Sequence, residues 1–374
     1  MRFLAKCHKL MCITLIIASA LVVGLMCFWF YMSRERGDPV ENYTAIASVF
    51  REQYALFELK GVNWDSLVAQ YAPLVTEETT DDELFEIFVE MLRVLDDKHC
   101  YIYRFNNIYF SGFDLPPLNY LELLSFDFRV DTGDFRMDVI EDKYLLDYEK
   151  SLRVISTHPP IGIRSVFTTG WLSDSIAYIH MTEMSNRSDK VESALSEFFT
   201  SYGDASGFVI DIRDNIGGYS LPVRELARRF TDSSRVYAVS RLRNGPDDFS
   251  EPEHWVLEPY PGQCFSEIPV MLLVNENTQS AAELFILMLC DLPNVTLVGD
   301  TTSGVFADTH TGKLPNGWEY RLSIRRTCDR NDRLLEDVGI VPDVIITNTP
   351  SDLDRGIDNV LEYAIEHILH TIYT

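Results

Sequence analysis

The chain has 374 residues, of which 46% are hydrophobic and 24% are charged, a composition typical of a globular protein with two or three domains. Its formal net charge is −25, and a surface this acidic repels phosphate backbones, which argues against nucleic acid as a partner. The seven cysteines show no C-x-x-C spacing, which argues against a zinc site, and we expect neither a metal nor a cofactor.

The first segment that stands out is the uncharged stretch from Met11 to Met32. As a helix of about 22 residues it would extend roughly 33 Å, enough to cross a bilayer. We therefore expect residues 1–36 to be a cytoplasmic tip and a transmembrane signal anchor, in a single-pass protein of the cell membrane with its bulk outside. A cleavable signal peptide is the alternative, because Ala18-Ser19-Ala20 resembles a cleavage site.

Helical spacing of apolar residues predicts a small helical subdomain over residues 37–102. Near its end, Leu95–Ile102 marks the change from a helix to a strand and contains His99. Residues 103–168 are rich in aromatic and alternating positions, and we expect an irregular or β connecting region there.

From residue 169 to 374, apolar runs typical of strands alternate with helical patterns, which predicts an α/β core around a largely parallel sheet, closed by a C-terminal helix. The expected strands are 176–181, 207–213, 236–242, 270–274 and 295–299. The expected helices are 191–199, 221–230 and 352–373.

One stretch of this core, residues 269–290, reads as a buried strand, a tight turn and a helix that starts at Ser280. A serine there could be a nucleophile, because the free backbone N–H groups of the first helical turn face the same space. Ser280 and Glu283 also form the pattern of a capping box, and this stretch alone favours the cap.

A second stretch, Asp211–Gly218, ends a strand with paired glycines, whose N–H groups can point into a cleft without a Cβ in the way. Together with Ala281 at the start of the later helix, Gly217 and Gly218 are candidate oxyanion donors. The alternative is a plain turn that requires positive φ. Such a turn explains the two glycines but not the D-x-R-x-N pattern that precedes them.

Five motifs occur in an order that resembles the tail-specific (C-terminal processing) peptidases and the core of tricorn protease. They are Leu95–His99, Asp211–Gly218, Thr278–Glu283, Val298–Gly304 and Gly339–Asp343. The resemblance covers residues 45–105 and 165–370. It implies an α/β fold with a ClpP/crotonase-like core, a small helical N-terminal subdomain and serine peptidase activity. No loop typical of a PDZ insert is present in the sequence.

The resemblance also implies which residues act. Tail-specific members use a lysine as the base, but Val305 stands at that place here, and Lys313 does not fit the motif. The tricorn-like branch instead uses a serine, a histidine and an acid, which implies Ser280, His99 and Glu336. Two points stay open in this branch: Asp337 is a rival for the acid, and Lys98 stands where the branch has a serine.

We therefore expect a serine endopeptidase that forms an acyl-enzyme on extended or unfolded peptide segments. A histidine pKa near 6.5, raised if Glu336 stabilises the cation, would follow. The alternative is a catalytically silent, membrane-anchored ectodomain of the same fold that binds a ligand or peptide. The oligomeric state and any pairing among Cys100, Cys264, Cys290 and Cys328 stay open.

Overall fold

The structure is a computed structural model and describes residues 37–104, 107–113, 116–119, 122, 133–155, 164–182, 184 and 188–374. The expected transmembrane anchor, residues 1–36, lies outside the described residues. Among the helices of the described part, none is both long and apolar enough to cross a membrane.

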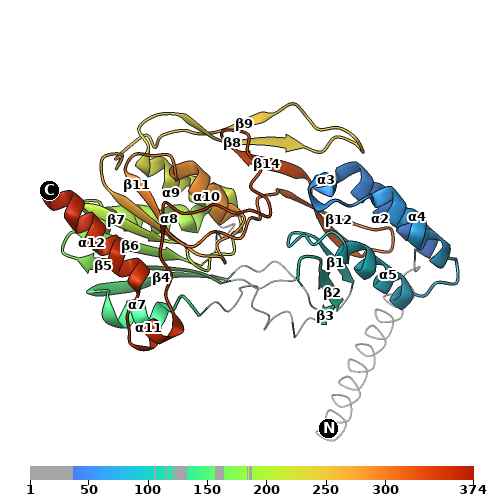
Figure 1. The fold of residues 1–374 in the computed structure, drawn as a ribbon, viewed down its shortest axis with the longest axis horizontal. Coiled ribbons are helices and arrows are strands. Elements are labelled where there is room, and N and C mark those ends of the chain that lie inside the picture. The colour runs from blue at the N-terminus through green and yellow to red at the C-terminus, as the bar shows by residue number, and fades with distance from the viewer. Residues whose placement is uncertain are drawn as a thin grey trace, which may run out of the picture.

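The first described elements are helices, as predicted, and Figure 1 shows them on one side of the molecule. They are α2 (Pro39–Gln53), α3 (Phe57–Lys60), α4 (Trp64–Tyr71), the short 3-10 helix η1 (Ala72–Leu74) and α5 (Asp81–Arg93). Their starts follow from the sequence: the side chain of Asp38 caps α2, and Thr80 forms a capping box with Glu83 at α5. Their buried faces pack around Phe50 and Phe88, in a core that also contains Tyr320 from much later in the chain.

Tyr320 reaches this core through a five-stranded antiparallel sheet with the order β12-β13-β1-β2-β3. Its strands are β1 (Tyr101–Arg104), β2 (Asn107–Phe110), β3 (Leu118–Asn119), β12 (Thr309–Lys313) and β13 (Glu319–Ser323). The first pair of the β1–β13 register is Tyr101 with Arg321. This pairing fixes the segment before Tyr101, which includes His99, against the second half of the chain.

The larger sheet has seven strands in the order β15-β11-β10-β7-β6-β5-β4 and is parallel from β15 to β6. The strands are β4 (Asp147–Ile155), β5 (Arg164–Ser173), β6 (Ile176–Met181), β7 (Gly207–Asp211), β10 (Val270–Val274), β11 (Val295–Gly299) and β15 (Val344–Ile345). The expected parallel sheet is therefore present. Two antiparallel strands, β5 and β4, extend it at one edge.

Helices cover both faces of this sheet (Figure 1). The helices in this part of the chain are α7 (Met137–Lys143), α8 (Ser188–Tyr202), α9 (Ser220–Ala227), η2 (Arg228–Phe230), α10 (Ala281–Leu289), α11 (Pro350–Asp354) and α12 (Asn359–Tyr373). Along β10, Leu272 packs in the core with α8, α9 and α10, whereas Met271 and Leu273 pack with α12. Because neighbouring side chains of a strand face opposite ways, β10 is buried on both faces, as predicted.

Two expected elements differ in the structure. The strand predicted at 236–242 is β8 (Arg235–Leu242), which lies outside the parallel sheet and pairs antiparallel with β9 (Glu253–Leu257) and β14 (Arg325–Asp329). The helix predicted at 352–373 is divided into α11 and α12, because Gly356 takes a left-handed φ of 72°.

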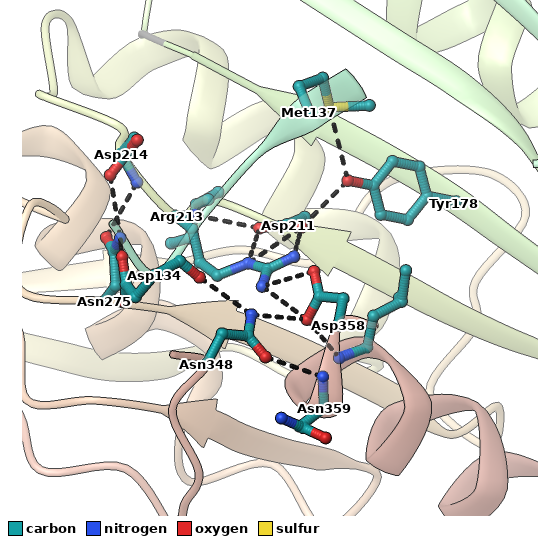
Figure 2. Close-up of polar contacts among 12 residues, drawn as sticks. Asp134, Met137, Tyr178, Asp211, Arg213, Asp214, Asn275, Asn348, Asp358 and Asn359 are labelled. Carbon is teal, nitrogen blue, oxygen red and sulfur yellow. Dashed lines mark hydrogen bonds and ion pairs between the residues drawn. The ribbon is translucent and has the colours of Figure 1, made fainter. Parts of the chain in front are cut away.

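Arg213, in the loop after β7, joins this strand to α12 (Figure 2). Its side chain is 1% exposed and forms ion pairs with Asp211 at 2.6 Å and Asp358 at 3.0 Å. Asp358 in turn caps α12 by accepting a hydrogen bond from the N–H of Leu361 at 3.1 Å. The buried guanidinium of Arg213 is thus paired with a carboxylate from β7 and with the carboxylate that caps α12. The glycine loop that follows Arg213 therefore starts from a fixed position.

Candidate active site

Ser280 is held in a strained backbone conformation between β10 and α10. Its φ of 58° and ψ of −123° lie in a region that residues with a Cβ rarely adopt. The turn before it is tied down: Thr278 donates from Oγ1 to the carbonyl of Ile212 at 2.9 Å, and the N–H of Gln279 donates to the carbonyl of Asn215 at 3.0 Å. Since such strain persists only where neighbouring contacts impose it, this serine is a candidate functional residue.

The hydroxyl of Ser280 faces a histidine. Ser280 and Glu283 form the expected capping box at the start of α10, in which the Ser280 N–H donates to Oε2 of Glu283 at 3.1 Å, and the Glu283 N–H also donates to the backbone carbonyl of Ser280 at 2.9 Å. The Ser280 Oγ lies 3.2 Å from Nε2 of His99. Acyl transfer by a serine needs a contact of this kind, between a hydroxyl and a ring nitrogen that can accept its proton.

Gly217 lies directly against Ser280. A Cβ on Gly217 would come within 2.6 Å of the Ser280 Cβ, so only glycine fits there. Its N–H, however, donates to Oδ1 of Asn215 at 2.9 Å, and this differs from its expected role as an oxyanion donor. Within the part of the chain that the structure describes, the N–H groups of Gly218 and Ala281 have no hydrogen-bond partner. Those two amides are therefore available to an oxyanion.

His99 sits in the turn between α5 and β1, and both of its backbone groups are fixed. Its N–H donates to Oδ1 of Asp97 at 2.8 Å, and its carbonyl accepts from Nε of Arg321 at 2.6 Å. Asp97 is buried and also accepts from the hydroxyl of Ser323 at 2.8 Å. The imidazole is thus placed by contacts from both halves of the chain.

The carboxylates of Asp97 and Glu336 lie close to the imidazole of His99. One ring nitrogen and one oxygen of each carboxylate lie within 4.8 Å of one another. A cation could bind between such atoms, but Asp97 already accepts hydrogen bonds, and Oε2 of Glu336 accepts from the N–H groups of Phe306 and Ala307 at 2.7 and 2.9 Å. Nδ1 of His99 is buried and unpartnered among the described residues. It is the ring nitrogen left for an orienting acid.

Glu283 connects Ser280 to the loop whose N–H groups bind Glu336. Its buried carboxylate accepts from the Ser280 N–H at 3.1 Å and from the N–H groups of Gly304 and Val305, both at 2.8 Å. Burial nevertheless raises the pKa of Glu283 to about 7. The next amides along this loop, 306 and 307, are the ones that bind Glu336. Hydrogen bonds at both ends of this loop, together with its backbone, therefore join Ser280 to Glu336.

Burial sets the protonation states of this site. It lowers the pKa of His99 to about 4, and the neighbouring Arg321 cation acts in the same direction, whereas Asp97 opposes both. Burial also raises the pKa of Glu336 well above its usual range, and the Asp97 charge adds to this effect. The resting imidazole is therefore neutral and able to accept a proton. This differs from the sequence expectation of a histidine pKa near 6.5 or raised.

The other residues that the sequence singled out do not contact Ser280 or the ring of His99 through any hydrogen bond among the described residues. Asp337, the rival acid, is 46% exposed and pairs with Lys60 at 2.7 Å, so the structure does not bring it to His99. Lys98 donates to the hydroxyl of Ser303 at 2.8 Å. Val305, at the place of the family lysine, is buried, and Lys313 lies at the end of β12. The four described cysteines are free.

Comparison with known proteins identifies the class. Residues 175–346 match the model of peptidase family S41, and residues 38–93 match the tricorn protease C1 domain. The chain therefore carries a region similar to peptidase family S41, preceded by a region similar to the tricorn protease C1 domain, and this combination is consistent with the tail-specific proteases.

Individual relatives are similar over part of their length. The carboxyl-terminal-processing protease of Picosynechococcus sp. is 26% identical over 181 residues, which cover 47% of this chain and 40% of that protein. The tricorn protease of Thermoplasma volcanium is 29% identical over 203 residues, which cover 52% of this chain and 17% of that protein. The chain thus spans less than half the length of these curated relatives.

The crystal structure of a candidate peptidase from Parabacteroides merdae is similar over nearly the whole fold. It matches with a TM-score of 0.69 and 26% sequence identity, covering 89% of this chain and 97% of the other. The mixed α/β fold predicted from the sequence is thus confirmed as that of S41 peptidase structures.

Proposed function

We propose that this protein is a serine endopeptidase that hydrolyses peptide bonds through an acyl-enzyme on Ser280. The observation that supports this most directly is the 3.2 Å contact between the Ser280 Oγ and Nε2 of His99, at a serine whose backbone is strained. The S41 domain of the chain favours the same chemistry. Extended or unfolded segments of peptides and proteins are the proposed substrates.

In the proposed reaction, the Ser280 oxygen attacks the substrate carbonyl carbon while Nε2 of neutral His99 takes the hydroxyl proton. The carbonyl oxygen becomes an oxyanion, which accepts hydrogen bonds from the N–H groups of Gly218 and Ala281. His99 then returns the proton to the leaving amine as the C–N bond breaks. A water molecule then attacks the acyl carbon while His99 takes its proton. His99 gives that proton to the Ser280 oxygen as the ester bond breaks and the acid product leaves.

Glu336 is proposed to orient the imidazole through Nδ1. The two are near one another without a hydrogen bond in the resting structure, and such contacts often tighten only when substrate binds. The neighbouring Asp97 carboxylate stabilises the imidazolium that forms during acylation, because its charge favours the protonated ring.

A fluorophosphonate probe tests the proposal directly, because it reacts covalently only with an activated serine. We expect the folded wild-type protein to be labelled at Ser280, located by peptide mass spectrometry, and Ser280→Ala to be unlabelled. Absence of labelling in folded wild-type protein would contradict the proposal and favour the silent binding ectodomain. The membrane anchor at residues 11–32 stays a prediction.

The pH dependence of the rate should differ from that of an ordinary histidine base. Because burial lowers the pKa of His99 to about 4, the neutral imidazole predominates above that pH, and the acylation rate should rise through about pH 4. At pH 5.5 we expect nearly the full rate, where a base with the usual pKa near 6.5 would keep about a tenth. Single-turnover acylation measured between pH 3.5 and 8, with stability checked at each pH, decides between them.

A further inference from the structure

Lys60, the last residue of α3, connects the two segments that flank His99 and Glu336. Its Nζ donates to the carbonyl oxygen of Asp96 at 2.7 Å and forms an ion pair with the carboxylate of Asp337 at 2.7 Å. Asp96 lies three positions before His99, and Asp337 directly follows Glu336. One cation from the N-terminal helices therefore contacts both the segment of the base and the segment of the acid.

Both segments take a backbone conformation that needs support. Asp96 has a φ of 45° and Asp337 a φ of 60°, in the left-handed region where a side chain is strained. Such conformations persist when the surrounding structure imposes them. Lys60 binds each of these two residues directly, which makes it one of the contacts that hold them.

The burial of Lys60 distinguishes this contact from an ordinary surface ion pair. Its side chain is only 8% exposed, although that of Asp337 is 46% exposed. A surface pair is weak because water competes and because two mobile side chains must be ordered. The ammonium group of Lys60 is largely withdrawn from water and is also fixed by a neutral carbonyl, so its geometry is restricted.

The segment before α3 is itself anchored to the catalytic half of the chain. The N–H of Ala55 donates to the carbonyl of Ser323 at 2.9 Å, and the carbonyl of Ala55 accepts from Nε of Arg326 at 3.1 Å. Ser323 is the same residue whose hydroxyl binds Asp97. The lysine therefore projects from a support that is fixed relative to the site.

We propose that Lys60 is a positioning residue, which sets the alignment of His99 and Glu336 by tethering Asp96 to Asp337. This inference rests on the proposed peptidase function. Through Lys60, the N-terminal helices would then contribute to the reaction as well as to the hydrophobic core. The tether acts on the transition state, because the base and its orienting acid must be aligned while the proton moves.

The test replaces Lys60 with methionine in the full chain, which keeps the length of the side chain and removes its charge and donors. We expect kcat to fall about 10- to 100-fold with KM nearly unchanged, because misplacement of catalytic groups costs rate and not substrate affinity. Lys60→Arg, which keeps the charge and the donors, should recover part of the loss. The measurements are steady-state hydrolysis of a quenched fluorescent peptide and the rate of fluorophosphonate labelling.

Arg51→Met is the matched control. Arg51 lies in the same helical unit and binds Asp65 at 2.9 Å in an exposed pair, so its loss also removes one cation. We expect this variant to keep the wild-type kcat. The double variant Lys60→Met/Asp337→Asn separates the tether from the charge: if the tether matters, the double variant stays as slow as Lys60→Met.

Three results would overturn the inference: a wild-type kcat in Lys60→Met, an equal loss in Arg51→Met, or full recovery in the double variant. If Lys60→Met does not fold, as judged by thermal unfolding, Lys60→Arg and Asp337→Asn replace it. A lower kcat at unchanged KM in those two supports the tether, and wild-type kcat in both overturns it. Wild-type protein that the probe does not label would instead refute the proposed function itself.

Discussion

Ser280→Ala is expected to abolish peptide hydrolysis while the protein keeps its fold. Removal of a serine nucleophile lowers kcat by up to about 10⁶-fold, and what is left comes from binding and the oxyanion donors. Stability should change by no more than the roughly 1 kcal/mol that a helix cap contributes, because the Glu283 half of the capping box binds the backbone N–H of residue 280 and survives the change. Peptide hydrolysis and thermal unfolding on the same preparation check both parts.

Ser280→Gly is a matched control for the strain at this position. It should be as inactive as the alanine variant but more stable, because glycine tolerates a φ of 58° and a ψ of −123° that strain alanine. The release of such strain is worth on the order of 1–3 kcal/mol. Turnover near the wild-type rate in either variant would contradict the assignment of Ser280 as the nucleophile.

His99→Ala is expected to lower the wild-type kcat by about 10⁴-fold or more. The reason is that, in the described part of the chain, no other side chain is hydrogen-bonded to the Ser280 hydroxyl to accept its proton. The turn should survive, since Asp97 and Arg321 bind the backbone of residue 99 and not its ring. Steady-state kinetics and circular dichroism measure the two effects.

Lys313→Ala is the control for the base, and it should be nearly neutral because Lys313 is exposed at the end of β12 and, within the described residues, the printed contact of the Ser280 hydroxyl is with His99. If Lys313→Ala were inactive and His99→Ala active, a lysine would be the base and the tricorn-like assignment would be wrong. The two variants therefore decide between a histidine and a lysine mechanism.

The sequence predicted the parts of the site that depend on local pattern. The run Val270–Val274 is apolar throughout, so it reads as a buried strand, and Ser280 at the following helix start is visible from spacing alone. The choice between cap and nucleophile was not local. It depends on where the Ser280 hydroxyl points, and that is decided by His99, which is 181 positions away.

The parts that the sequence left open depend on long-range packing. The low pKa of His99 comes from burial and from Arg321, whose contact with the His99 carbonyl joins residues 222 positions apart. The occupied N–H of Gly217 depends on the rotamer of Asn215. The motif D-D-x-H contains Asp97. That Asp97 is buried and accepts a hydrogen bond from Ser323 depends on the pairing of β1 with β13, which the local sequence does not reveal.

The same separation along the chain has a consequence for biosynthesis. The proposed base, nucleophile and acid appear in the order His99, Ser280, Glu336, and His99 is fixed by Arg321 near the last of them. A chain still emerging from the ribosome lacks the complete set until residue 336 has been made, although its parallel strands can already pair. Contacts between such distant residues also form slowly. The nascent chain therefore lacks the proposed hydrolytic activity while its own unfolded segments are most exposed to digestion.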